Sequence, residues 1–401
     1  MELVLGLTPT PPANAFVTEE QINEHQETFP LDVFFCEDCA HVQLLDVVDP
    51  AHLFENYVYV SGTSPVFVKH FEGYANTVAE RYIGETANKL VVDIGSNDGT
   101  LLGKFKDLGL MVLGIDPARD IAAEASASGI ETKTAFFTSM LAEEIRQSHG
   151  PAKVICANNV YAHADDLIDI TRGIRALLAP DGVFVFEVSY LVDVFEKTLF
   201  DTIYHEHVAY HSVRPLKRFF AEQGMELIAA DRISSHGGSL RGVVQLAGGP
   251  YNIEPSVNEL ILLEEGLGLN KTETLRQFAA KIDACKSQLI FLLEELKASG
   301  KTVAAFGAPA KATTLMYHFG IGPDIIDFIV DDSPLKQNMY SPGMHIPVLP
   351  SAAIYEKEPD AVVILAWNFA EPIMKNHAAY LEQGGEFLVP LPRFQSFKSL
   401  N

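Results

Sequence analysis

The sequence predicts an α/β protein with two Rossmann-like units and a small β-rich module before them. Three observations predict this class. Apolar runs of strand length alternate with helical patterns from about residue 82 to 230, and the alternation restarts near Lys301. Residues 1–80 instead hold only short strand-like runs among prolines, phenylalanines and acids. Because strands separated by helices pair in parallel, we expect a sheet with helices on both faces in each of the two units.

The expected elements divide the chain into four parts. These are an N-terminal module, a first Rossmann-like unit, a glycine-rich segment with a long connecting helix, and a second Rossmann-like unit, at residues 1–80, 81–230, 231–300 and 301–401. Expected strands are 31–36 and 41–48 in the module, 90–94, 111–115, 154–157 and 182–188 in the first unit, and 302–306, 325–330 and 361–366 in the second. The charged, helix-periodic stretch 256–299 should bridge the two units.

Composition excludes several classes of function. The chain has 401 residues, 48% of them apolar, which is enough for two or three packed domains. A formal net charge of −24 repels a phosphate backbone, so nucleic acid is not an expected partner. Four cysteines do not make a disulfide framework. No apolar run approaches the ~20 residues that cross a bilayer, so we expect a cytoplasmic protein without a membrane partner.

The segment KLVVDIGSNDGTLL, residues 89–102, has the pattern of a cofactor turn. An apolar strand that contains Asp93 leads into Gly95 and Gly99, and a helix begins after them. The spacing D-x-G-x-x-x-G differs from the G-x-G-x-x-G of dinucleotide folds, whose third glycine leaves room beside a pyrophosphate. A second strand ends at Asp116, whose carboxylate can accept hydrogen bonds from two ribose hydroxyls. This layout is that of class I S-adenosylmethionine (SAM) methyltransferases, although a glycine-rich turn of another α/β protein is the alternative.

The ends of neighbouring strands supply the candidate cofactor residues. Asn158 and Asn159 follow the strand 154–157 and therefore lie at the carboxyl edge of the sheet, where ligands bind. His163 comes soon after them and is expected to face the transferred methyl, with a helix cap as the alternative. The candidate cofactor residues are Asp93, Gly95, Ser96, Asn97, Asp98, Gly99, Asp116, Asn158 and Asn159.

The run Tyr204-His205-Glu206-His207, followed by Tyr210 and His211, gathers groups that move protons near neutral pH. Acid–base chemistry is our first interpretation. A hydrogen-bonded structural cluster is the second, and a metal site is the third, because zinc usually takes three or four ligands. Since neighbouring residues of a strand point to opposite faces, these side chains can share a pocket only in a turn or helix, and we expect a loop.

A second glycine turn lies in the C-terminal unit. The strand 302–306 leads to Gly307, and Lys311 follows in the first turn of a helix. A helix N-terminus with an ammonium group suits a diphosphate, whereas a solvated lysine is the plain alternative. Asp331 and Asp332 end the next strand, and we expect them either to bind a hydroxyl of a sugar or to cap a helix.

Cys36 and Cys39 form a C-x-x-C pair and are candidate zinc ligands. A zinc knuckle needs a second pair, and none precedes them in the sequence. Cys156 falls on a buried strand and Cys285 on a helix, so both are expected to be small apolar fillers.

Taken in order, the motifs resemble those of SAM-dependent sugar-nucleotide C-methyltransferases, which add a methyl branch to a deoxysugar. The resemblance covers nearly the whole chain. The segments that carry it are PPANAF, FFCEDCAHVQLLDVVDP, YVYVSGTSP, DIGSNDGTLL, ANNVYAHADDL, DTIYHEHVAYHS, SSHGGSLRG, GAPAKATTL and VDDSPLKQNMYSPGMHIPV. It implies a zinc-binding N-terminal module, a central SAM domain and a C-terminal Rossmann-like domain that helps to hold the nucleotide sugar. Members usually carry a first C-x-x-C that this sequence lacks, through an upstream start or loss of the metal, so the zinc site is incomplete as written.

The resemblance also implies roles for individual residues. It assigns His207 as the base, with Glu206 beside it. Tyr204 and His163 are implied in the active site. The N-terminal tyrosine of the family's active site matches Tyr59, with Tyr57 as the second choice. The residues expected to contact the sugar nucleotide are Tyr57, His236, Arg241, Gly307, Lys311 and Asp332.

The sequence therefore predicts a C-methyltransferase that deprotonates a keto-deoxysugar nucleotide next to its carbonyl and methylates the enolate carbon. Carbon methylation needs a base, donors for the developing oxyanion and a cofactor fixed opposite. An O- or N-methyltransferase of another small molecule is the first alternative, and a nucleotide-binding protein without catalysis is the second.

Overall fold

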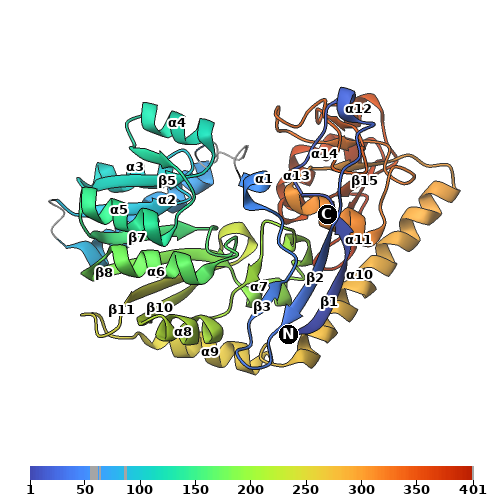
Figure 1. The fold of residues 1–401 in the computed structure, drawn as a ribbon. Coiled ribbons are helices and arrows are strands. Elements are labelled where there is room, and N and C mark those ends of the chain that lie inside the picture. The colour runs from blue at the N-terminus through green and yellow to red at the C-terminus, as the bar shows by residue number, and fades with distance from the viewer. Residues whose placement is uncertain (55–61, 63–64, 85–87, 400–401) are drawn as a thin grey trace.

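The computed structural model describes residues 1–54, 62, 65–84 and 88–399 (Figure 1). Among these residues the strands form three sheets, of four, seven and six strands. Two of the sheets are mainly parallel and carry helices, and the four-stranded sheet is antiparallel. The prediction of two Rossmann-like units and a small β-rich module is therefore confirmed.

The N-terminal sheet has the strand order β1-β2-β3-β9. Its strands are β1 (Glu2–Thr10), β2 (Phe29–Phe35), β3 (Val42–Leu44) and β9 (Ala209–Tyr210). In β2 the side chains of Leu31, Val33 and Phe35 alternate into the core, as the two-residue period of a strand requires. The last strand comes from a distant part of the chain, because Val42 pairs with Tyr210.

The central sheet has the strand order β10-β11-β8-β7-β4-β5-β6. The strands β4 to β8 are parallel to one another, and β11 is antiparallel to both of its neighbours. The bounds are β4 (Leu90–Ile94), β5 (Met111–Asp116), β6 (Thr132–Thr134), β7 (Ala152–Asn158), β8 (Leu178–Ser189), β10 (Met225–Ile233) and β11 (Ser239–Leu246). The chain continues from β4 to β5 and β6 on one side, and then crosses from β6 to β7 on the other side of β4. The strand order therefore reverses at β4, and a crevice for a ligand is expected at its carboxyl end.

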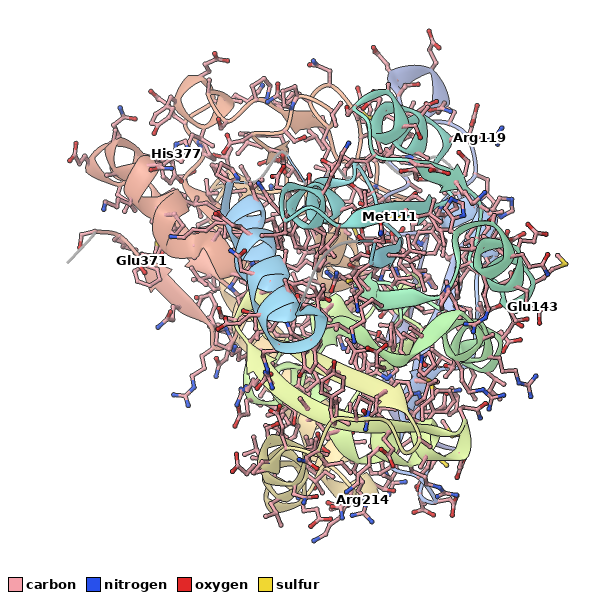
Figure 2. All side chains as sticks on the ribbon, turned by 90° about the vertical axis from the view of Figure 1, so that its left-hand side faces the viewer. Met111, Arg119, Glu143, Arg214, Glu371 and His377 are labelled. Atoms are coloured by element: carbon pink, nitrogen blue, oxygen red, sulfur yellow. The ribbon has the colours of Figure 1, made fainter. Side chains whose placement is uncertain are left out.

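Helices cover both faces of the central sheet. They are α2 (Pro65–Val78), α3 (Thr100–Asp107), α4 (Arg119–Ala127), α5 (Ser139–His149), α6 (Leu167–Leu177), α7 (Leu191–Glu196) and α8 (Val213–Glu222), with a π-helical turn at Ala79–Ile83. Val91 of β4 packs with α2 and α3, whereas Val92 joins the core of α5, α6 and α8 on the other face. Figure 2 shows α2 at the front, between the labelled His377 on one side and Met111 on the other.

The C-terminal sheet has the strand order β14-β13-β12-β15-β16-β17, with only β17 antiparallel. Its strands are β12 (Val303–Phe306), β13 (Ile329–Val330), β14 (Val348–Leu349), β15 (Ala361–Ile364), β16 (Glu386–Val389) and β17 (Gln395–Phe397). Its helices are α11 (Ala310–Phe319), α12 (Ala353–Glu356), α13 (Ala370–Asn376) and α14 (Ala378–Glu382), with a 3₁₀ turn at Trp367–Phe369. The order reverses at β12, just as it reverses at β4 in the central sheet.

The connection between the two units consists of two helices, α9 (Pro255–Gly266) and α10 (Thr272–Ala298). The sequence predicts one continuous helix here, but Gly268 adopts a left-handed φ of 73° and ends the first helix. The long helix α10 then runs beside β1 and the C-terminal unit (Figure 1). None of the helices in the described part of the chain is long and apolar enough to span a membrane.

Candidate active site

The cofactor turn lies at the carboxyl end of β4, where the strand order reverses. Gly95 and Gly99 have left-handed φ angles of 71° and 77°, and the Gly95 N–H donates to the carbonyl of Ile115 over 2.7 Å. A Cβ on Gly95 would lie 2.3 Å from Cγ2 of Val160. Both the backbone conformation and the space at this position therefore require glycine.

Asp116, at the end of β5, holds the turn in place. Its Oδ2 accepts the Asn97 N–H over 2.8 Å, and its Oδ1 accepts the Ala118 N–H over 2.9 Å. Asn97 itself has a left-handed φ of 52°. Burial raises the pKa of Asp116. An ionised carboxylate offers about four acceptor positions. Two positions therefore suit hydroxyl donors of a ligand after the two backbone bonds are made.

Several buried polar atoms around the turn have no hydrogen-bond partner among the described residues. They are Oδ1 of Asp93, Oγ of Ser96, and both the Oδ1 and Nδ2 of Asn158. Asp93 and Asn158 lie near the carboxyl ends of the adjacent strands β4 and β7. Buried polar groups are nearly always paired, so their grouping at one sheet edge marks a place for a polar ligand. The hydroxyl, amine and carboxylate groups of SAM fit these donors and acceptors.

The buried carboxyl of Asp93 predicts an unusual pH dependence of stability. Burial and the neighbouring Asp116 raise the pKa of Asp93 from 3.8 to about 8. In the unfolded chain this pKa is ordinary, so between about pH 4 and pH 8 unfolding releases a proton and stability falls as the pH rises. We expect Asp93→Asn to remove this pH-dependent contribution. Without SAM, the wild type should therefore lose more stability than the mutant between pH 5 and pH 8. The melting temperature of the mutant minus that of the wild type should increase over this range. A difference that stays constant with pH would contradict the assignment.

Two other predicted cofactor residues have structural partners. Asp98 contacts the first residue of α3, because its Oδ1 accepts from the backbone N–H and the hydroxyl of Thr100 over 3.1 and 2.7 Å. Its Oδ2 accepts the Gly62 N–H over 2.8 Å. Asn159 has a left-handed φ of 55° and donates its N–H to the carbonyl of Glu187. Asp98 thus shapes the edge of the crevice through its carboxylate, and Asn159 does so through its backbone.

The run 204–207 is a turn, as expected, with the His207 N–H donating to the Tyr204 carbonyl over 2.8 Å. The Nδ1 of His207 lies 2.6 Å from the carbonyl oxygen of Thr202. A carbonyl oxygen can only accept, so Nδ1 carries the proton in this contact. In the neutral imidazole, Nε2 is then the basic nitrogen.

Four aromatic rings lie in a row that begins in this turn, with Tyr204 tilted against His207 and the other two pairs stacked. Tyr204 and His207 have centroids 4.1 Å apart, His207 and His163 are 5.0 Å apart, and His163 lies 5.4 Å from Phe54 at an interplanar angle of 10°. Burial, together with His207, holds the pKa of His163 well below 6.5. The Nε2 of His163 is buried without a hydrogen-bond partner in the described part of the chain. The structure thus brings three of the predicted active-site residues together.

The other polar residues of the run contact the N-terminal module. Oε1 of Glu206 accepts from Nδ2 of Asn14 over 2.9 Å. The ring of His205 lies against Phe29 and contacts its carbonyl oxygen. His211 is buried near His41, and burial lowers the pKa of His211 to about 3. The run therefore combines a candidate base with side chains that join it to the N-terminal sheet.

The C-terminal glycine turn repeats the hydrogen bonds of the first. Gly307 has a left-handed φ of 89° and donates its N–H to the Val330 carbonyl. Asp331 accepts the N–H groups of Ala308 and Ser333 over 2.6 and 2.8 Å, as Asp116 accepts those of its own turn. The neighbouring Asp332 is exposed.

Lys311, predicted to contact a diphosphate, is directed elsewhere in the structure. Its Nζ lies 3.8 Å from Oδ2 of Asp201 and 4.3 Å from the centre of the Trp367 ring. The Lys311 side chain is 15% exposed and Asp201 is fully buried. Partial burial lowers the pKa of Lys311, and burial raises that of Asp201. The lysine thus joins the C-terminal unit to the segment before the Tyr204 turn.

Arg241 also has a structural partner. Its Nε donates to Glu187 over 2.7 Å, and its guanidinium lies 4.5 Å from the centre of the Tyr74 ring. Glu187 is buried at the end of β8 and lies 2.9 Å from Nε2 of His70. His236 lies in the 3₁₀ turn Ser235–Gly237. Tyr57 and Tyr59 lie outside the described residues.

The sequence reasoning missed four residues of this region, namely Glu187, Asp201, Thr202 and Trp367. Three of them stood out in the sequence. Asp201 and Thr202 begin the motif DTIYHEH, and Trp367 is the single tryptophan of the chain. Thr202 acts through its backbone carbonyl, which side-chain chemistry cannot indicate.

The candidate zinc ligands Cys36 and Cys39 are both half-exposed free thiols. Within residues 1–54, 62, 65–84 and 88–399, no group of three or more His, Cys, Asp or Glu side chains is arranged to hold a metal ion. A structural zinc site takes four ligands. The thiol pair alone does not fit one, so no role is assigned to zinc.

A sheet of this order, with a glycine turn at its reversal and an acid on the next strand, defines a class I SAM-dependent methyltransferase. Family profiles agree over consecutive segments, with a putative zinc binding domain at residues 1–54, a methyltransferase domain at 72–230 and a C-methyltransferase C-terminal domain at 234–392. The C-methyltransferase NovU of Streptomyces niveus is 36% identical over 389 residues, which cover 97% of this chain and 92% of NovU. The chain belongs to this C-methyltransferase family, whose cofactor is SAM.

Solved structures overlap about half of the chain. The CcbJ methyltransferase of Streptomyces caelestis covers 49% of this chain and 96% of its own, at 15% identity and a TM-score of 0.36. The PH0226 protein of Pyrococcus horikoshii OT3 covers 50% of this chain and 96% of its own, at 14% identity and a TM-score of 0.36.

Proposed function

We propose that this C-methyltransferase acts on a keto-deoxysugar nucleotide and methylates the carbon next to its carbonyl. An alkyl carbon is not a nucleophile until a proton has left it, and an adjacent carbonyl makes that loss feasible by forming an enolate. The sequence motifs support this class of small-molecule acceptor. When bound, SAM supplies an electrophilic methyl group, and the protein must provide the base, the oxyanion donors and the orientation.

His207 is the proposed base, and one observation carries this role. The Nδ1–H···O contact of 2.6 Å with Thr202 assigns the proton of the neutral ring to Nδ1, so that Nε2 accepts the proton of the acceptor carbon. Glu206 is proposed to orient the turn through its bond with Asn14.

Tyr204 and His163 are the proposed donors to the enolate oxygen. Both side chains lie in the row of rings with His207. His163 remains neutral because of its lowered pKa, and its Nε2–H tautomer would donate into the site. Tyr59 remains a further candidate on the strength of the sequence motif alone.

The two glycine turns are proposed to hold the two ligands. Asp93, Ser96, Asn158 and Asp116 would bind SAM through the buried acceptors and donors described above. The turn at Gly307 and the nearby Asp332 are the proposed nucleotide contacts. Tyr57, His236 and Arg241 stay candidates for the sugar-nucleotide side, and Lys311 is proposed to act by way of Asp201 instead.

The test is incubation of the protein with SAM and a panel of keto-deoxysugar nucleotides, followed by mass analysis for an added methyl group. A second arm omits SAM and measures solvent-deuterium exchange at the sugar carbon. We expect exchange without SAM, because only methylation at carbon requires that proton to leave. Methyl transfer without exchange, or no transfer to any panel member, would contradict the proposal.

A further inference from the structure

The C-terminal unit places a buried charged cluster beside the turn that carries His207. Asp201 is fully buried, and its Oδ2 accepts the Nε1–H of Trp367 over 2.6 Å. Lys311 lies 3.8 Å from the same oxygen and packs over the tryptophan ring. Trp367 and Lys311 belong to the C-terminal unit, whereas Asp201 lies in the 3₁₀ turn Phe200–Thr202 that precedes the run 204–207.

Further contacts fix the anchor segment, residues 200–203, to helix α11. The hydroxyl of Thr314 donates to the Ile203 carbonyl over 2.7 Å, and Phe200 stacks on Phe319 with centroids 5.2 Å apart. Between these contacts lies the Thr202 carbonyl, which accepts the Nδ1–H of His207. The oxygen that sets the tautomer of the candidate base is therefore held from the C-terminal unit.

We propose that Asp201, Trp367 and Lys311 are positioning residues for His207. They fix the anchor segment so that the Thr202 carbonyl holds the imidazole in the tautomer with a basic Nε2. The inference rests on the proposed role of His207 as the base.

A purely stabilising role explains this cluster poorly. Burying a lysine and an aspartate costs desolvation free energy that their attraction barely offsets, so an apolar packing would serve stability at least as well. A role in positioning explains the cluster better, because a catalytic base must be held within about 0.5 Å of its productive position. Asp201 is the residue directly before Thr202, whose carbonyl holds the His207 ring.

The experiment measures the tautomer of His207 in the full chain labelled with ¹⁵N-histidine, by long-range ¹H–¹⁵N NMR at pH 8. The His207 signals are identified as those that vanish in His207→Gln. In the wild type we expect a protonated Nδ1. In Trp367→Phe, which keeps an aromatic ring but removes the indole N–H, and in Lys311→Met, we expect a mixture of the two tautomers. Lys311→Arg should restore the wild-type pattern.

Lys153→Met is the matched control. Lys153 is likewise an ion-paired lysine with little exposure, 2.8 Å from Asp181, but it lies near the amino end of β7, away from the crevice. We expect it to lower the melting temperature and leave the tautomer of His207 unchanged. An unchanged tautomer in both Trp367→Phe and Lys311→Met would overturn the proposal.

Activity separates this proposal from the proposed function. On the methylated member of the sugar-nucleotide panel, Trp367→Phe should lower kcat by about 10- to 100-fold, the loss typical of a misplaced group, with KM for SAM unchanged. If His207→Gln keeps full turnover, the base assignment fails, whatever the tautomer measurement shows. If His207→Gln is inactive while both cluster variants keep the wild-type kcat and tautomer, only the positioning role fails.

Discussion

Replacement of His207 by glutamine is expected to lower kcat by about 10²- to 10⁴-fold, the usual contribution of a general base. The amide retains a donor for the Thr202 carbonyl, so the turn should keep its conformation, but it cannot take up the proton of the acceptor carbon. The affinity for SAM should hardly change, because the cofactor turn lies on β4. The measurements are steady-state turnover on the methylated sugar nucleotide and SAM binding by calorimetry.

The matched control for His207→Gln is His205→Gln. His205 lies two residues away, but its ring contacts the Phe29 carbonyl and packs on the N-terminal module. We expect this variant to lose stability and retain most of its kcat. Turnover by His207→Gln within threefold of the wild type would remove His207 from the role of base.

Asp116→Asn is expected to raise the dissociation constant for SAM at least about 10-fold, because hydrogen bonds to a charged group contribute about 1.5–3 kcal/mol each. The amide oxygen can still accept one backbone N–H, but the amide nitrogen would face the second. The turn should therefore loosen, and the melting temperature should fall as well. Calorimetric titration with SAM and a thermal melt measure the two effects.

Asp120→Asn provides the comparison for Asp116→Asn. Asp120 is an exposed carboxylate in the first turn of α4, four residues after the end of β5. Asp120→Asn removes one negative charge from the same region and leaves the contacts of the cofactor turn intact. If both variants bind SAM as the wild type does, Asp116 does not contact the cofactor.

Local patterns predicted the fold and the first half of the site. The strand around Asp93, the glycines at 95 and 99, and Asp116 could be found because they depend on short-range periodicity and backbone conformation. Parallel pairing of β4 with β5 and β7 then brings them to one edge. The same reasoning found Gly307 and the acids that follow β13.

Contacts between distant parts of the chain could not be predicted in this way. Lys311 occupies the first turn of α11, where a phosphate partner was the natural expectation, yet its ammonium meets a carboxylate 110 positions earlier in the sequence. Only the packing of the two units determines that choice. The break in the connecting helix could not be predicted either. The glycine at position 268 is visible in the sequence, but its left-handed backbone conformation is not.

The strand β9 carries a consequence for building hybrid enzymes. Ala209–Tyr210 completes the N-terminal sheet two residues after His207, and Val42 and Gln43 are its partners. The N-terminal sheet is therefore not formed by residues 1–54 alone. A chimera that exchanged residues 1–54 between two relatives would have to bring the matching 209–210 pair with it, or the edge of β3 would pair with a foreign strand that begins two residues after the proposed base.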